Sequence, residues 1–217
     1  SWATGSEAIA LIEALGAETA TVIGHDWGAS AAYAAANQAP ERISRLVTMA
    51  VPYGPQLGRS FMLDGDQQRR SWYMFFFQTP MAVMAAAAND FAFIDRLWSE
   101  WSPGYRLPDA DRAALKAMFA EPGVLEETLA YYRQLFGGPG VKAEWAERAA
   151  VAGAPIAIPS LYLHGRNDGC IGVDLTEGME ALFPAGLRTV IVEDAGHFLQ
   201  LEQPAQIADE ILAFLAS

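Results

Sequence analysis

The pattern of apolar and polar positions predicts strands near both ends of the chain. An amphipathic helix is expected over Ser6–Leu15, and the β-branched apolar run Thr21–His25 predicts a buried strand. An alanine-rich helix is expected over Ala29–Asn37, followed by a second strand over Ile43–Ala50. A strand, a helix and a strand in this order form a crossover unit, so we expect the two strands to be parallel.

Strand patterns return in the last third of the chain. The apolar runs Ile158–His164 and Leu187–Glu193 predict two more strands, with a helix over Thr176–Phe183 between them. A final helix is expected over Pro204–Leu215. This part is again built from alternating strands and helices, which favours an α/β fold with a mostly parallel sheet.

About one hundred residues between these two parts contain no convincing strand pattern. They show helical periodicity instead, over Gln67–Gln78, Met81–Ala88, Phe91–Glu100, Asp109–Phe119, Pro122–Phe136 and Lys142–Ala149. We therefore expect a helical insertion over residues 55–155, between a first core part, 1–54, and a second core part, 156–217.

The segment Gly24-His25-Asp26-Trp27-Gly28 joins the first predicted strand to its helix. A polar residue flanked by small residues at a strand–turn–helix junction is the nucleophile-elbow pattern, although serine is its usual central residue. A carboxylate at a helix N-terminus is favoured in its ionised form. Asp26 is therefore a candidate nucleophile that would form an alkyl-enzyme ester. The alternative is a turn aspartate that only caps the helix.

Two further polar residues follow predicted strands. Asp168 lies in the loop after Ile158–His164, and His197 lies in the loop after Leu187–Glu193. Because the carboxyl ends of parallel strands share one edge of a sheet, Asp26, Asp168 and His197 are expected to converge there. His197 would act as a general base, and Asp168 would orient it and stabilise its charged form. Each residue alone could instead be an ordinary loop residue.

Composition and charge narrow the function classes. The chain has 217 residues, 52% of them hydrophobic, which indicates a globular protein. Its formal net charge of −12 argues against nucleic acid or an anionic membrane as a partner. The single cysteine, Cys170, excludes an internal disulfide and fits a reducing compartment, and no apolar run is long enough to span a bilayer. We therefore expect a cytoplasmic location.

The chain resembles the epoxide hydrolase branch of the α/β-hydrolase superfamily. The resemblance runs from end to end and is carried by three motifs: Gly24–Gly28, His164-Gly165-Arg166-Asn167-Asp168, and Gly196-His197-Phe198 with Glu202-Gln203-Pro204. It implies an α/β-hydrolase fold with helices on both faces of the sheet and an inserted helical cap. It also implies conversion of an epoxide to a vicinal diol, with no cofactor and no metal.

The resemblance assigns further residues to the site. Two cap tyrosines of the family donate hydrogen bonds to the epoxide oxygen, and the segments Trp72–Gln78 and Tyr131–Arg133 point to Tyr73 and to Tyr132 rather than Tyr131. The residues alone favour a place for both tyrosines in an aromatic core. Other expected oxyanion or substrate contacts are Trp27, His25, Phe77 and Phe198. The expected partners are a small apolar epoxide and water.

The family also has earlier strands and a His-Gly-x-Pro loop that nothing here matches. We therefore expect this chain to be the C-terminal two thirds of such an enzyme, with only the Trp27 amide left for an oxyanion hole and with uncertain activity alone. The strand Thr21–His25 would then have an unpaired edge, which favours association, including a homodimer. The competing interpretations are a haloalkane dehalogenase, in which Trp27 would bind halide, and a non-catalytic relative that binds a small apolar ligand.

Overall fold

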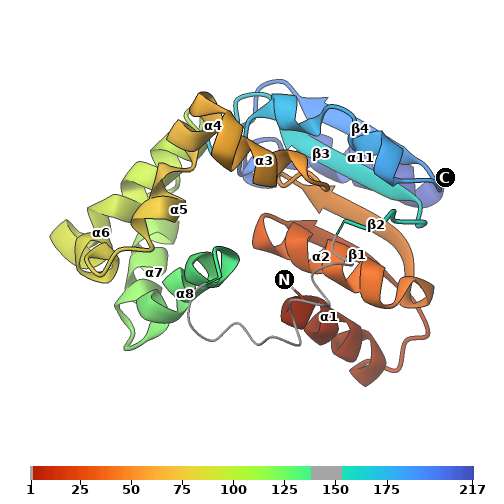
Figure 1. The fold of residues 1–217 in the computed structure, drawn as a ribbon, viewed down its shortest axis with the longest axis horizontal. Helices are drawn as coiled ribbons and strands as arrows, with labels where there is room; N and C mark the ends of the chain where they lie inside the picture. The colour runs from red at the N-terminus through yellow and green to blue at the C-terminus, as the bar shows by residue number, and fades with distance from the viewer. Residues whose placement is uncertain (1, 138–152) are drawn as a thin grey trace.

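A computed structural model describes residues 2–137 and 153–217 of the chain (Figure 1). The first core part contains the expected crossover unit. Its elements are α1 (Trp2–Ala14), β1 (Ala20–His25), α2 (Trp27–Gln38), a 3₁₀ turn (Pro40–Arg42) and β2 (Ile43–Met49). The predicted helices and strands of this part are confirmed to within a few residues at their ends.

The four strands form one parallel sheet in the order β1-β2-β3-β4. The last two are β3 (Ser160–Gly165) and β4 (Leu187–Val192), and they are followed by α10 (Leu199–Glu202) and α11 (Pro204–Ala216). The sheet order follows the chain order, and β1 is an edge strand in which the side chain of Ile23 is half-exposed. The expected parallel sheet is therefore confirmed.

The helix predicted over Thr176–Phe183 is wrong. Two 3₁₀ turns, Val173–Thr176 and Met179–Leu182, occupy this stretch. Gly178 lies between them with a φ of +76°, a left-handed conformation that interrupts a right-handed helix. The apolar residues of this segment still point inward, and Met179 is completely buried.

Side chains that alternate along the strands fill the space on both faces of the sheet. Leu46 and Tyr162 belong to a core cluster on the face covered by α2, whereas Val47 and Leu161 belong to a cluster with Phe214 of α11. Helix α1 packs against α2 (Figure 1). Because both faces are covered, β3 is buried along its whole length and β2 is buried from Leu46 to Met49, as expected for interior parallel strands.

Between β2 and β3 the described residues form helices and no strand. We call this group the helical block, and its members are α3 (Gln56–Leu63), α4 (Gly65–Arg70), α5 (Trp72–Phe76), α6 (Ala82–Trp101), α7 (Asp109–Ala120) and α8 (Val124–Leu135). In Figure 1 most of it lies to one side of the sheet. No helix among the described residues is both long and apolar enough to cross a membrane.

The boundaries in the helical block differ from the prediction in three places. Helix α3 was not predicted, and the helix expected over Gln67–Gln78 is divided at Ser71 into α4 and α5. Helix α6 includes both predicted segments, Met81–Ala88 and Phe91–Glu100, with a non-helical kink between them at Ala88–Phe91. The helix expected over Lys142–Ala149 lies outside the described residues.

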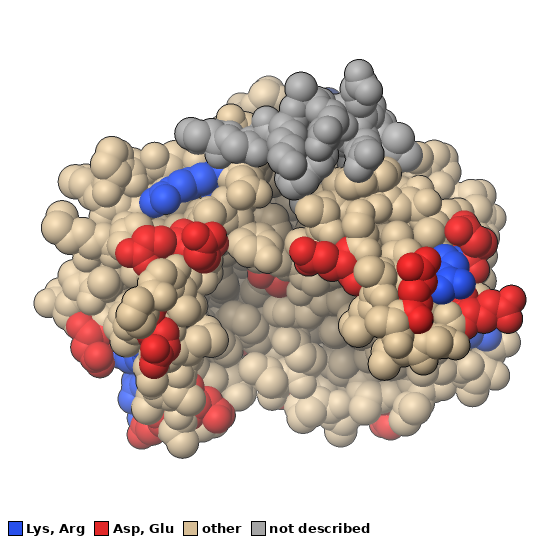
Figure 2. Space-filling model, turned by 90° about the horizontal axis from the view of Figure 1, so that it is seen from below, with Lys and Arg blue, Asp and Glu red and all other residues tan. Residues whose placement is uncertain are grey.

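Figure 2 shows the surface hollowed between the helical block and the sheet. The carboxyl ends of the strands lie toward the helical block, because α3 leaves β2 in that direction (Figure 1). The turn between β1 and α2 therefore lies where the two parts of the protein meet.

That turn depends on a close approach of two backbone segments. A Cβ atom added to Gly24, at the end of β1, would lie 2.2 Å from the carbonyl oxygen of Gly28 in α2. At Gly28 itself an added Cβ would meet no atom within 4 Å. The strand and the helix can thus pack this tightly only if residue 24 has no side chain.

We expect opposite effects from two alanine substitutions. Gly24→Ala should lower the free energy of unfolding by about 3 kcal/mol, because the backbone of α2 must move away. Gly28→Ala should raise it by roughly 0.5 to 1 kcal/mol, since alanine favours a helix more than glycine does. Urea denaturation of the two variants measures both, and equal stability of Gly24→Ala and the parent would contradict the packing argument.

Candidate active site

Asp26 occupies the strained turn between β1 and α2. Its φ is +54° and its ψ is −120°, in a region that residues other than glycine rarely adopt. The turn is held by the Asp26 N–H, which donates to the carbonyl of Met49 at 3.2 Å, and by the Asp26 carbonyl, which accepts from Ala29 N–H at 2.9 Å. The carboxylate makes no capping hydrogen bond to α2, so the simple N-cap interpretation is wrong.

Asp168 lies in the loop after β3, completely buried, and both of its carboxylate oxygens are engaged. Oδ1 accepts hydrogen bonds from the N–H groups of Cys170, at 2.7 Å, and Ile171, at 2.9 Å. Oδ2 accepts from Nδ1 of His197 at 2.9 Å. The loop backbone therefore points one lobe of the carboxylate at the histidine.

His197 lies between the two carboxylates and is completely buried. Because Nδ1 donates to Asp168, Nε2 is directed toward Asp26, with 3.5 Å between Nε2 and Oδ1 of Asp26. Burial lowers the pKa of His197, but Asp168 and Asp26 outweigh it and raise the pKa to about 10. At neutral pH the imidazole is therefore charged.

The pKa of Asp26 responds to the same contact in the opposite direction. Burial raises the pKa of this carboxyl, whereas the nearby His197 and, more weakly, His25 and the Trp27 N–H lower it, and the net shift is downward. Asp26 and His197 thus form an ion pair at the edge of the sheet. The expected convergence of Asp26, Asp168 and His197 is present in the structure.

The other two histidines have structural hydrogen bonds. Nε2 of His25 donates to the carbonyl of His197 at 2.8 Å. His164 is completely buried, accepts from the Tyr162 hydroxyl at 2.6 Å and donates from Nε2 to the carbonyl of Ile171 at 3.0 Å. Burial is the largest cause of a lowered pKa at both histidines, so both are neutral at pH 7.

Tyr73 and Tyr132 come together from α5 and α8, with ring centroids 5.6 Å apart. Tyr132 is 8% exposed, and its ring meets that of Trp27 edge-on, whereas its neighbour Tyr131 is 48% exposed. Burial raises the pKa of both Tyr73 and Tyr132, and the charge of Asp26 adds to this. Both phenols are therefore neutral hydrogen-bond donors close to that carboxylate.

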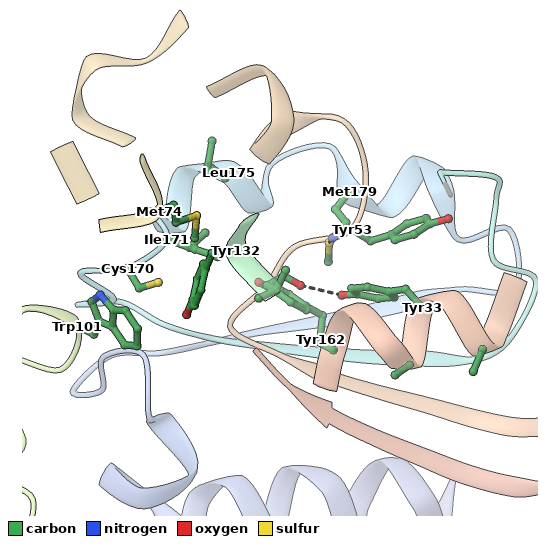
Figure 3. Close-up of a cluster of buried hydrophobic side chains, with 14 of the residues drawn as sticks. Tyr33, Tyr53, Met74, Trp101, Tyr132, Tyr162, Cys170, Ile171, Leu175 and Met179 are labelled. Carbon is green, nitrogen blue, oxygen red and sulfur yellow. Dashed lines mark hydrogen bonds between the residues drawn. The ribbon is translucent and has the colours of Figure 1, made fainter. Parts of the chain in front are cut away.

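A cavity of about 270 Å³ adjoins Asp26 and extends along one face of α2. Trp27, Ser30 and Asn37 line it on the helix side, and Tyr132 lines it from the helical block. The remaining wall is largely apolar, with contributions from Val51, Leu57, Phe61, Met74, Leu135 and Ile171. Figure 3 shows a cluster of buried hydrophobic side chains in which Met74 and Tyr132 lie to the left of Tyr33 and Tyr53.

The other predicted contact residues do not line the cavity. Tyr73, His25, Phe77 and Phe198 are not among its described lining residues. The Tyr73 hydroxyl lies 3.2 Å from the Cys170 sulfur, and Phe77 packs on Tyr73 and Tyr132. Phe198 stacks on Trp98 at 3.8 Å between ring centroids. Tyr73 and Phe77 thus pack behind Tyr132, whereas His25 and Phe198 contact His197.

One group of potential metal ligands occurs among the described residues. Ligand atoms of Asp168, Cys170 and His197 lie within 4.8 Å of one another. Both oxygens of Asp168 and Nδ1 of His197 are already engaged in hydrogen bonds. Burial and the two nearby carboxylates raise the pKa of the Cys170 thiol, which disfavours the thiolate that a metal requires. The residues do not fit a metal site.

Sequence reasoning did not anticipate several cavity residues. Leu57 and Phe61 belong to α3, a helix that was not predicted. Ser30, Ala34 and Asn37 lie on one face of α2 at helical spacing from Asp26, and this spacing was the available signal.

The curated relatives most similar to this chain include several epoxide hydrolases. Human epoxide hydrolase 4 is 27% identical over 211 residues, which cover 94% of this chain and 56% of that protein. Epoxide hydrolase 1 of Caenorhabditis elegans is 26% identical, with coverage of 94% and 50%. The chain therefore spans about half the length of these relatives.

Solved structures agree with the fold. The structure of Bacillus megaterium epoxide hydrolase with an inhibitor matches with a TM-score of 0.79 and 24% identity, over 98% of this chain and 75% of that one. The family model described as alpha/beta hydrolase fold matches residues 7–204. The parallel sheet, its strand-end polar residues and these matches lead to one conclusion: the chain belongs to the alpha/beta hydrolase fold family.

Proposed function

We propose that this chain carries the reaction centre of an epoxide hydrolase, with Asp26 as nucleophile and the helical block as its cap. One observation carries the proposal: Nε2 of His197 faces Asp26, while Nδ1 is held by Asp168, beside a cavity that Tyr132 also lines. The names of the relatives support the same reaction class. The domain division stays as expected from the sequence, with 55–155 as the cap.

In the first step, an Asp26 oxygen attacks a ring carbon of the epoxide. The carbon–oxygen bond breaks, and the ring oxygen takes a proton from a tyrosine hydroxyl. Tyr132 borders the cavity, and Tyr73 stands beside it. Because burial raises the pKa of both phenols, they keep their protons until a strongly basic alkoxide forms.

In the second step, water attacks the ester carbonyl of Asp26, and His197 takes a proton from that water. The diol leaves and the carboxylate is restored. Hydrolysis of an ester to a carboxylate releases one proton, which His197 keeps as the imidazolium of the free protein. In this proposal the Trp27 N–H, next to the strained turn, donates to the developing oxyanion.

The charge of Asp26 also controls when His197 acts as a base. In the free protein two carboxylates raise the pKa of His197 to about 10, so the imidazole is protonated and cannot accept a proton. Ester formation removes the charge of Asp26, so Asp168 is then the charged carboxylate that remains in contact with His197. The pKa of His197 must then fall, so the imidazolium gives its proton back to the tyrosinate, and the neutral imidazole becomes available for the hydrolysis step.

A haloalkane dehalogenase is the second candidate, because it uses the same nucleophile. The pair Tyr73 and Tyr132 favours the epoxide, since a halide leaving group needs no proton. Release of a diol from styrene oxide against release of bromide from a bromoalkane distinguishes the two. If neither product is released and an apolar ligand binds at the cavity, the result favours the non-catalytic relative.

The nucleophile is tested by trapping the ester. We expect Asp26→Ala to abolish turnover, and His197→Gln to accumulate a covalent adduct on Asp26 that mass spectrometry of a peptide digest detects. Asp168→Asn should slow hydrolysis more than alkylation. Turnover by Asp26→Ala at the parent rate would contradict the mechanism.

The charge state of His197 predicts how stability depends on pH. The folded protein holds the pKa near 10, above the usual 6.5, so the imidazolium contributes stability that is complete below pH 6.5. That contribution is lost as pH rises through 10. Urea denaturation between pH 6 and 10.5 should show that the free energy of unfolding falls more steeply with pH in the parent than in His197→Gln. Other groups titrate in both proteins, so their effects cancel in this comparison. Parallel curves of unfolding free energy against pH for the two proteins would contradict the predicted charge state of His197.

The two tyrosines are tested with their neighbour as a control. Tyr73→Phe or Tyr132→Phe should slow ring opening about tenfold to a hundredfold, because one phenol remains, and the double variant should nearly abolish it. Tyr131→Phe removes a hydroxyl from the more exposed neighbour and should leave the rate unchanged. Stopped-flow measurement of alkylation gives these rates, and a double variant at the parent rate would assign both tyrosines to packing.

A further inference from the structure

Three consecutive backbone N–H groups around His197 are each held by a separate acceptor. The N–H of Gly196 donates to Oε1 of Glu202 at 2.9 Å. The N–H of His197 donates to the carbonyl of Trp101 at 3.0 Å. The N–H of Phe198 donates to the hydroxyl oxygen of Ser102 at 3.0 Å. Two of the three acceptors come from the end of α6, almost one hundred residues earlier in the chain.

Ser102 has a defined role in this network because a hydroxyl has only one proton. The Ser102 hydroxyl donates that proton to Oε1 of Glu202 at 2.7 Å, so its oxygen is free to accept from Phe198. Ser102 is completely buried. Glu202, the glutamate of the Glu-Gln-Pro motif, thus binds both Ser102 and the Gly196 N–H through one oxygen.

The same chain segment also contacts the loop that carries Asp168. The Trp101 carbonyl accepts a second hydrogen bond, from Gly169 N–H at 3.1 Å. A Cβ atom at Gly169 would lie 1.8 Å from the carbonyl oxygen of Glu100, and one at Gly196 would lie 2.7 Å from Cα of Ser102. Residues Glu100–Ser102 are therefore in close backbone contact with both loops.

We propose that Ser102, linked to Glu202, is a positioning residue that holds the backbone of His197 so that its imidazole bridges Asp168 and Asp26. The catalytic part of this inference rests on the proposed function, whereas the effect on the imidazole does not. The ring contacts, 2.9 Å to Asp168 and 3.5 Å to Asp26, depend on where residues 196–198 hold the Cα atom. A displacement of about 1 Å can slow a reaction a hundredfold.

Removal of the hydroxyl should release this loop. In Ser102→Ala the buried N–H of Phe198 loses its acceptor, and Glu202 loses a donor. The loop then relaxes, and the imidazole moves away from at least one carboxylate. Neither Ser102 nor Glu202 lines the cavity, so their substitution leaves the binding surface for a substrate intact.

The first readout is the imidazole itself, measured in this chain by nitrogen-15 NMR. Ser102→Ala should lower the titration midpoint of His197 by about one pH unit and broaden its Nδ1 proton signal. Ser99→Ala is the matched control: Ser99 is exposed on the same helix, and its hydroxyl donates only to the Arg96 carbonyl. The control should keep the parent midpoint.

Glu202 supplies a conservative rescue. Glu202→Gln retains an Oε1 acceptor and should keep the parent midpoint, whereas Glu202→Ala should shift it as Ser102→Ala does. If Ser102→Ala does not fold, the comparison of the two Glu202 variants decides. Reduced thermal stability with an unchanged His197 titration in Ser102→Ala and Glu202→Ala would overturn the proposal.

Kinetics then separate the positioning role from the proposed function. In protein that turns over epoxides, Ser102→Ala should slow ester hydrolysis at least about tenfold and change ring opening less than twofold, because only hydrolysis needs the base. Equal slowing of both steps would overturn the positioning role. If Ser102→Ala shifts the His197 titration but the parent protein never forms an ester on Asp26, the proposed function is overturned and the positioning role stands.

Discussion

Two carboxylates share one imidazole, and this charge arrangement sets the demands on the rest of the structure: Asp168 is completely buried, and Asp26 is partly exposed beside the cavity. A buried carboxylate is tolerated only when it is paired or hydrogen-bonded. Asp168 meets this requirement through two backbone N–H groups and the histidine, whereas Asp26 depends mainly on His197. The sheet brings Asp26, Asp168 and His197 together because β1, β3 and β4 all end at the same edge, so the three loops that carry these residues are in contact.

Close backbone contact is the second requirement, and glycines provide it. Gly24 allows β1 to approach α2, and an added Cβ at Gly165 would lie 2.1 Å from the carbonyl oxygen of Gly196. Gly169 and Gly196 likewise allow the backbone at the end of α6 to come close to their loops. The aromatic cluster of Tyr73, Phe77 and Tyr132 packs against Trp27 from the helical block without adding charge.

The sequence predicted the strands and the convergence of the polar loops because both have local signals. Apolar runs marked the strands, and Asp26, Asp168 and His197 each followed one. The helix expected over Thr176–Phe183 failed at Gly178, and the one over Gln67–Gln78 failed at Ser71, whose buried hydroxyl accepts from Gln67. Tyr73 and Tyr132 were found only through a family resemblance. The contact between Ser102 and Phe198 had no local signal, because it joins segments 96 residues apart.

The segment Glu100–Ser102 at the end of α6 limits how the helical block can be exchanged between relatives. The helical block joins the core not only at its two chain crossings but also through the carbonyl of Trp101, which accepts N–H groups from the loops of both Asp168 and His197. A helical block transplanted from another member of the family would bring its own residues to this position. Grafts that retain Glu100–Ser102 from the recipient should keep the core aligned, whereas grafts that replace them must supply an equivalent carbonyl and hydroxyl.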